Sequence, residues 1–157
     1  MQYGVVEIDG QQYVERAQIF PVDVNVTVNF QVLAQQRVTL PGVANFLLKG
    51  LTRETIAGGT SSPRRFKFRL GNSDGQTWYI SGGIGSTTDR AMDTLVMGSG
   101  MFPYPIIPPI PYSAGANIAF EVEDISGAAP YLINFAFHGS YLIPVGVAVT
   151  GSSSSGG

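Results

Sequence analysis

The most regular hydrophobic pattern of the chain covers residues 22–32. Every second position in this segment is Val or Phe, and the positions between them are Asp, Asn, Thr or Gln. A period of two sends alternate side chains to opposite faces of a strand, and β-branched residues pack well on a pleated surface. The pattern therefore predicts a long strand with one buried face and one short, polar face.

Two further segments alternate in the same way, but their outward positions are charged. Residues 65–70 alternate apolar and basic side chains, and residues 118–123 alternate apolar side chains with two acidic ones. We expect the two charged faces to pair across a sheet or between subunits. Such pairs determine strand register and choice of partner more than they add to stability. These candidate interface residues are Arg65, Lys67, Arg69, Glu121 and Glu123.

Shorter apolar segments between strong turn signals predict the remaining strands. They are residues 4–8, 12–15, 44–51, 77–81, 131–138 and, with a weaker pattern, 141–149. The turn signals are Asp9-Gly10, Pro41-Gly42, Gly58-Gly59, Asn72-Ser73-Asp74-Gly75, Gly82-Gly83 and Ser126-Gly127. Many short strands joined by tight turns are typical of an all-β, antiparallel β-sandwich, and we expect a jelly-roll-like one. A helix is expected only at residues 88–96.

Residues 102–112 read FPYPIIPPIPY and contain five prolines. Proline lacks a backbone N–H and fixes φ, so this segment cannot be a central strand and is expected to be extended and polyproline-like. Its apolar side chains need cover, either on the chain's own sandwich or on a neighbouring protein. They are further interface candidates: Phe102, Tyr104, Ile106, Ile107, Ile110 and Tyr112.

The chain divides into three parts by pattern. Residues 1–20 alternate poorly and are expected to form an N-terminal arm or edge strands, which could add to the sheet of a neighbour. Residues 21–149 form the β-sandwich domain. Residues 150–157 are a Gly/Ser tail, whose composition is typical of a flexible segment.

Charge is sparse along the whole chain. Only 13% of the 157 residues are charged, about half the usual share, and the formal net charge is -2. No run of like charge favours nucleic acid or an anionic membrane as partner, and no segment approaches the roughly 20 apolar residues of a membrane-spanning helix. The absence of cysteine excludes disulfides. We therefore expect a surface that is neutral or covered by neighbouring proteins.

Candidate catalytic and metal-binding residues are few. His138 is the single histidine, and we interpret it as a hydrogen-bonded strand residue, with a general base as the alternative. Residues 72–75 resemble the start of a calcium loop but lack the later carboxylates, so a turn is preferred. Asp89 and Asp93, with Arg90 between them, could supply two metal ligands on a helix, but a helix N-terminal cap or a local pair of arginine and carboxylate is preferred. We expect no enzyme activity, no cofactor and no metal.

Trp78 and Tyr79 follow the turn at residues 72–75. Adjacent aromatic side chains on a surface could form a platform for a carbohydrate, whereas the ordinary alternative places one in the core and leaves the other partly exposed. The pair is therefore kept as a candidate glycan-binding site.

Three segments from Phe66 onward resemble a group of small tailed-bacteriophage virion proteins. They are RLGNSDGQTWY at residues 69–79, FPYPIIPPIPY at residues 102–112 and FHGSYLIP at residues 137–144. The resemblance covers about the C-terminal half of the chain. It implies a structural role on a capsid, as a cement or decoration protein, and jelly-roll-like folds are common among such proteins.

The sequence and the resemblance together predict a virion protein located on the capsid exterior and assembled in the host cytoplasm. Its expected partners are the lattice of the major capsid protein and further copies of itself in a small homo-oligomer, without nucleic acid or membrane. The alternative is a receptor- or glycan-binding module of a phage head or tail fibre.

Overall fold

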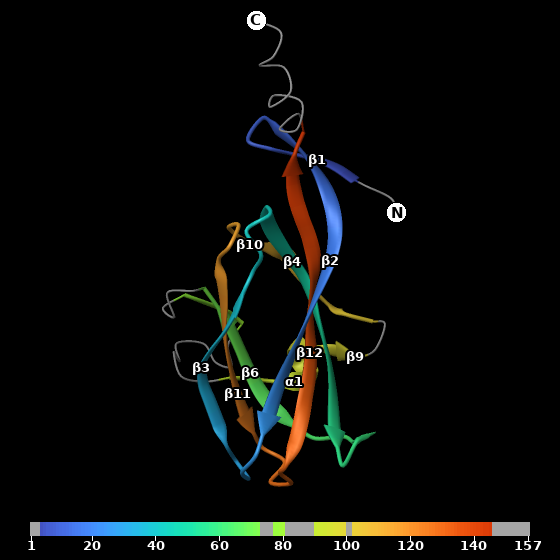
Figure 1. Cartoon of the computed structure of the whole chain (residues 1–157), viewed down its shortest axis with the longest axis vertical. Coiled ribbons are helices and arrows are strands. Elements are labelled where there is room, and N and C mark those ends of the chain that lie inside the picture. The colour runs from blue at the N-terminus through green and yellow to red at the C-terminus, as the bar shows by residue number, and fades with distance from the viewer. Residues whose placement is uncertain (1–3, 73–76, 81–89, 100–101, 146–157) are drawn as a thin grey trace, which may run out of the picture.

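The computed structural model describes residues 4–72, 77–80, 90–99 and 102–145. Two β-sheets pack face to face, and the strands of both run along the long axis of the molecule (Figure 1). The expected turns at residues 73–75 and 82–83, the Gly/Ser tail and the residues after 145 lie outside the described residues.

The first sheet has the strand order β1-β2-β12-β4-β10, and every pair along this path is antiparallel. The strands are β1 (Gly4–Ile8), β2 (Gln11–Val26), β12 (Tyr131–Pro144), β4 (Asn45–Ala57) and β10 (Tyr104–Tyr112). Two short strands, β5 (Thr60–Ser61) and β9 (Gly98–Ser99), also pair with β4.

The second sheet has the order β3-β11-β6-β7. Its strands are β3 (Val32–Thr39), β11 (Asn117–Asp124), β6 (Phe66–Gly71) and β7 (Trp78–Ile80), and the short β8 (Ala91–Met92) also pairs with β6. The one helix of the described residues, α1 (Asp93–Val96), is a single turn that follows β8 directly. It falls inside the segment expected to be helical, which was predicted too long.

The core between the sheets is rich in aromatic side chains. Phe120 of β11 lies 5.1 Å from Phe135 of β12, and Phe68 of β6 lies 5.6 Å from the same ring, measured between ring centroids. Each such edge-to-face pair contributes about 0.5 to 1.5 kcal/mol beyond the burial of its surface. These contacts cross from one sheet to the other, and the prediction of an all-β antiparallel sandwich is confirmed.

The prediction of one strand over residues 22–32 is correct only up to Val26. There β2 ends, a turn follows, and β3 begins at Val32. The side chain of Gln31 accepts hydrogen bonds from the backbone N–H groups of Thr27 and Val28, and Phe30 takes a positive φ of 58°. The local side-chain bonds therefore reverse the chain, although the alternating pattern continues through the turn.

Other boundaries also differ from the predicted ones. The segment from residue 33 to residue 39 was missed, and it completes β3. The two segments predicted at residues 131–138 and 141–149 form one strand, β12, up to Pro144. The boundary expected at residue 20 lies inside β2, which passes through it without a break.

The proline-rich segment forms β10 at the edge of the first sheet, paired with β4 on one side. Its register shifts between Pro105 and Ile110, where a bulge interrupts the pairing. The expectation of an extended segment that is not a central strand is confirmed. Proline has no N–H group to donate, and an edge strand tolerates this because one of its two sides needs no partner strand.

Candidate functional site

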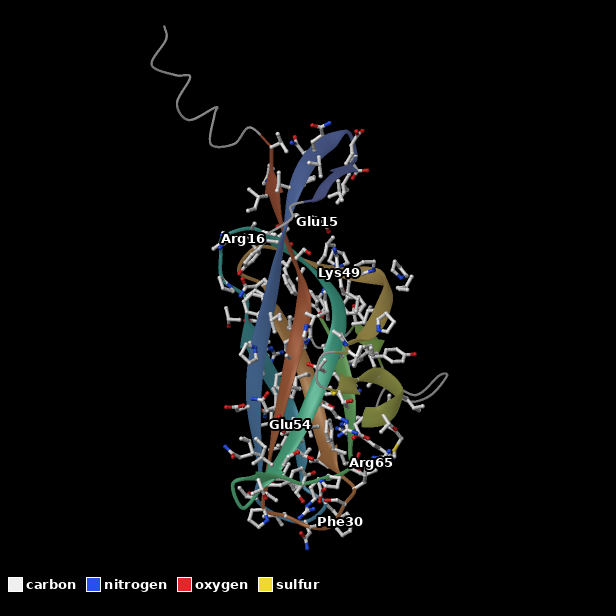
Figure 2. All side chains as sticks on the ribbon, turned by 90° about the vertical axis from the view of Figure 1, so that its right-hand side faces the viewer. Glu15, Arg16, Phe30, Lys49, Glu54 and Arg65 are labelled. Carbon is white, nitrogen blue, oxygen red and sulfur yellow. The ribbon has the colours of Figure 1, made fainter. Side chains whose placement is uncertain are left out.

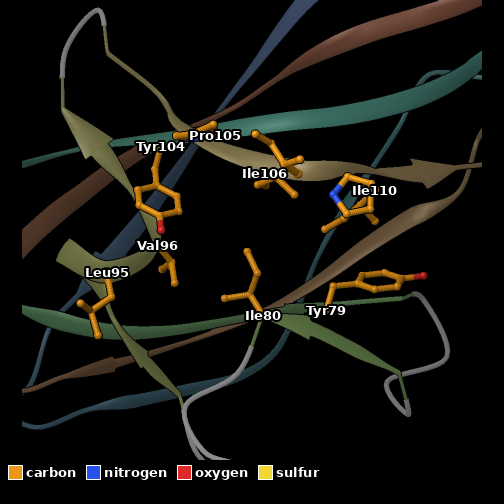
Figure 3. Close-up of a pocket in the computed structure, with 10 residues that line it drawn as sticks. Tyr79, Ile80, Leu95, Val96, Tyr104, Pro105, Ile106 and Ile110 are labelled. Atoms are coloured by element: carbon orange, nitrogen blue, oxygen red, sulfur yellow. The ribbon is translucent and has the colours of Figure 1, made fainter.

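A hollow of about 600 Å³ lies at the open edge of the sandwich, between β10 of the first sheet and β7 of the second. We call it the edge groove. Figure 3 shows Tyr104, Pro105, Ile106 and Ile110 along one side and Tyr79 and Ile80 along the other, while Leu95 and Val96 of α1 close one end. None of the ten residues that line the groove is charged.

Large apolar side chains surround the edge groove and face solvent. Of the lining residues, Ile107 keeps 85% of its surface exposed, and Leu95, Tyr104 and Tyr79 are also exposed. Phe102 keeps 78% of its surface exposed but does not line the groove. Contiguous apolar patches of this kind are rare on monomeric soluble proteins and mark places where another molecule binds.

The proline-rich strand thus serves two purposes, both of which the sequence left open. Ile110 and Tyr112 are buried in the chain's own core, and Ile106 is half-buried. The hydroxyl group of Tyr112 donates a hydrogen bond of 3.1 Å to the carbonyl oxygen of Gly71, and burial raises the pKa of this tyrosine. The C-terminal half of β10 is therefore fixed to the second sheet, while its N-terminal half presents apolar side chains outward.

The predicted pairing of the two charged faces occurs within the chain. Arg69 of β6 and Glu121 of β11 are opposite each other in register, and Arg69 Nε donates to Glu121 Oε2 at 2.6 Å. Arg90 donates to the same oxygen at 2.7 Å and to Glu123 at 3.2 Å. Because Arg69 and Glu121 are both buried, they lie beneath the surface that a partner could contact.

Burial acts on Glu121 against its charged form and would raise its pKa. The hydrogen bonds from Arg69 and Arg90, together with the charges of these two arginines, outweigh burial and hold the pKa below its usual range. Glu121 is therefore ionised at neutral pH and belongs to a structural ion cluster.

Asp93 forms a second ion cluster that the sequence did not indicate. Its carboxylate is fully buried and lies 2.9 Å from Arg53 Nε and 3.0 Å from Arg65 Nε. Arg65 also donates to the hydroxyl group of Thr94. For Asp93 the expected roles of helix cap and partner of Arg90 are wrong, because Arg53 of β4 and Arg65, just before β6, reach it instead. Asp89 lies outside the described residues. The cluster fixes α1 to β4 and to the start of β6.

Lys67 faces Glu123 in the register of β6 and β11, and both side chains are half-buried. Arg65 keeps about half of its side chain exposed despite its contact with Asp93. Of the five charged candidates, Arg65, Lys67 and Glu123 are therefore partly accessible at the surface.

The two aromatic residues proposed as a glycan platform lie differently. The guanidinium carbon of Arg69 lies 3.7 Å from the ring centroid of Trp78. The guanidinium group therefore covers one face of the indole, which is half-buried. Tyr79 is exposed at the edge groove and contacts Tyr112 edge to face at 6.0 Å. The two rings therefore do not form one open platform.

His138 lies on β12, where its Nε2 atom is 2.8 Å from the hydroxyl oxygen of Thr52. Burial lowers the pKa of this histidine, so that it is neutral at pH 7. The interpretation as a hydrogen-bonded strand residue is confirmed. Among the described residues, no group of three or more His, Asp or Glu side chains could hold a metal ion.

A third feature is the arm, which we define as residues 4–15, made of β1 and the first part of β2. Together with the end of β12, it extends past the rest of the sandwich (Figure 1). None of residues 4–15 is buried, and no strand of the second sheet reaches this part in Figure 1. Figure 2 places Glu15 near Lys49 at the base of the arm, where their side chains form an ion pair of 2.7 Å.

The exposed side chains of the arm are apolar, acidic or, at Gln11 and Gln12, neutral amides. Val5 and Ile8 are exposed large hydrophobic residues, and Glu7 and Asp9 lie beside them. The turn between the two strands is Asp9-Gly10, with φ values of 52° and 78°, which suits a tight hairpin turn.

Comparison with known proteins identifies no relative, since no protein-family model, curated protein or solved structure matches the chain. The resemblance to phage virion proteins consequently stays a prediction based on three short segments. Within the residues that the structure describes, no helix is long and apolar enough to cross a membrane.

Proposed function

We propose that the chain is a structural protein of a bacteriophage virion, a capsid cement or decoration protein that binds the outside of the major capsid shell and stabilises it. The observation that carries this proposal is the arm, a part of the sheet that projects from the sandwich without a second layer. Protein–protein contact is the use that such a feature fits best.

The second sheet does not cover the arm (Figure 1). Strands gain stability from burying one face, and an isolated hairpin is at best marginally stable in water. The arm leaves Val5 and Ile8 exposed, and the outer edge of β1 offers unpaired N–H and C=O groups. A strand of a neighbouring protein can pair with that edge, and its side chains can cover Val5 on one face of β1 and Ile8 on the other.

Strand topology supports the proposal as well. The sandwich has eight principal strands, which we count from first to eighth along the chain: β2, β3, β4, β6, β7, β10, β11 and β12. In one sheet the order is first, eighth, third and sixth. In the other sheet it is second, seventh, fourth and fifth. We infer that the sandwich is a jelly roll, an architecture used by viral capsid and lectin domains. The fold alone does not decide the function, because one fold supports many.

The arm can be tested by binding of purified chain to shells assembled from the major capsid protein of the same virus. We expect deletion of residues 1–8 to abolish binding and Val5→Lys to weaken it by about tenfold, because a charge then enters the buried interface. Binding is measured by co-sedimentation with shells. The matched control is Val28→Lys, which changes an equally exposed valine in the turn of Phe30, at the opposite end of the molecule (Figure 2).

Two results would contradict the proposal. One is wild-type chain that does not sediment with shells at micromolar concentration. The other is an equal loss of binding in the Val5 and Val28 variants, which would show that exposed apolar residues anywhere cause adhesion.

Glycan binding by a head- or tail-fibre module is the second candidate function. The observation in its favour is that Tyr79 and Tyr104 are exposed on opposite sides of the edge groove, which suits stacking on a sugar ring. Trp78 contributes less than its sequence position suggested, because Arg69 covers one face. Binding on a glycan array that Tyr79→Ala abolishes would support this candidate, and an array without signal would exclude the sugars it carries.

A further inference from the structure

We propose that the edge groove joins two copies of this chain face to face in a symmetric pair. A contact between two copies goes beyond the proposed binding to the capsid shell. Only the biological role of the pair rests on the proposed function. Its physical basis is separate, because the groove shares no residue with the arm.

The exposed area is sufficient for a specific contact. Four side chains that line the groove are exposed for between 41% and 85% of their surface: Tyr79, Leu95, Tyr104 and Ile107. Since a large side chain offers about 150 to 250 Å², they present roughly 500 Å² per chain. Two copies in contact would bury about 1,000 Å², which is the area at which a specific interface becomes plausible.

The patch contains both an exposed side chain and a hollow. Ile107 projects from β10 with 85% of its surface exposed, directly beside a hollow of about 600 Å³ walled by Ile80, Val96 and Ile106. A twofold axis uses the same patch on both molecules, so each Ile107 can enter the hollow of the other at the same time. A protrusion and a hollow on one patch are what such an interface requires.

Charge also favours a second copy as the occupant. In a twofold contact a charged residue near the axis meets its own copy, and a charged residue elsewhere in an apolar patch is buried without a partner; both cost free energy. The edge groove has no charged lining residue, and Asp93 at the start of α1 is paired with Arg53 and Arg65. Two copies can therefore approach without repulsion and without burying an unpaired charge.

The contact must use side chains rather than strand pairing. β10 is an edge strand, but Pro105, Pro108, Pro109 and Pro111 have no N–H group to donate to an added strand. This blocks the continuous sheet that a free edge would otherwise allow. The arm and the groove therefore use different contacts, strand addition in one case and packing of apolar side chains in the other.

Sedimentation velocity of the full-length chain between about 1 and 100 μM, a range in which specific pairs of this size associate, tests the proposal. We expect a dimer for the wild type and a monomer for Ile107→Asp, since two carboxylates would meet an apolar hollow. Leu95→Asp, on α1 across the groove, should give the same result. Val28→Asp is the matched control and should remain dimeric. Circular dichroism confirms that each variant is folded.

Four outcomes separate this inference from the proposed function when the same samples are also sedimented with shells. A monomeric wild type that still binds shells overturns the pair and leaves the function standing. A dimer that Ile107→Asp dissociates, but that never binds shells, supports the pair and overturns the function. A monomeric wild type whose shell binding falls in Ile107→Asp assigns the groove to the shell and overturns the pair. A trimer sensitive to Ile107→Asp overturns the twofold arrangement.

Discussion

Asp124 connects two turns that are far apart in the sequence. Its carboxylate accepts hydrogen bonds from the N–H group of Phe30 at 2.9 Å, the N–H and hydroxyl groups of Ser126, the N–H group of Gly127 at 3.1 Å and the hydroxyl group of Tyr131 at 2.7 Å. Burial raises the pKa of this carboxyl group, but the hydrogen bonds from Ser126, Tyr131 and Phe30 outweigh burial and lower the pKa to about 2. The charged form therefore stabilises this end of the sandwich.

Acid should remove that stabilisation. The pKa of Asp124 is lower in the folded chain than in the unfolded one, so its contribution is complete above about pH 5 and is lost as pH falls toward 2. We expect Asp124→Asn to lower the free energy of unfolding by about 2 kcal/mol at pH 7 and by much less at pH 2.5. Urea unfolding at both pH values measures this difference.

The exposed Asp23 provides the control for this prediction. Asp23→Asn should change the free energy of unfolding by less than about 0.5 kcal/mol at either pH, as most surface substitutions do. A difference between wild type and Asp124→Asn that stays constant from pH 7 to pH 2.5 would contradict the assigned role of the charge.

At this scale the sequence is least informative. Nothing in the chain around residue 124 distinguishes its carboxylate from the exposed Asp23, because its donors come from Phe30 and Tyr131 as well as from neighbouring residues. Asp93 is similar, since its partners are Arg53 on β4 and Arg65 just before β6. Such contacts depend on the tertiary fold, which single-sequence patterns do not describe.

At the scale of elements, β6 and β11 illustrate what alternation predicts well. The pairing of a basic and an acidic face was predictable because period two alone places Arg69 and Glu121 on outward positions. Their burial was not, since it depends on Arg90, which joins them from outside the two strands. The turn at residues 27–31 was also missed. The alternating pattern there favours a strand, but hydrogen bonds to the side chains of Gln31 and Asp124 stabilise a turn.

The two glutamates of β11 should differ strongly in their effect on stability. Glu121→Gln removes the buried carboxylate that Arg69 and Arg90 share, so we expect a loss of about 3 kcal/mol in the free energy of unfolding. Glu123→Gln removes a partly exposed ion pair and should cost less than about 1 kcal/mol. Urea unfolding at pH 7 compares them, and equal losses would contradict the buried cluster.

At the scale of the whole molecule, the sandwich leaves two apolar surfaces uncovered. One is the arm, whose strand edge is free, and the other is the edge groove, whose prolines exclude strand pairing. A chain with few charges and two such surfaces fits permanent contact with other proteins, because neighbours cover what a free monomer would expose. The proline-rich segment was recognisable from the sequence, but the division of its side chains between core and surface required the fold.

Cryo-electron microscopy of the native phage particle tests the central claim most directly. We expect density for the sandwich on the outer surface of the capsid, with the arm paired to a strand of a neighbouring protein and the edge groove facing a second copy. A particle whose shell and tail both lack this density would contradict the proposed role as a virion protein. Density at a tail fibre, with the arm free in solvent, would contradict the cement role.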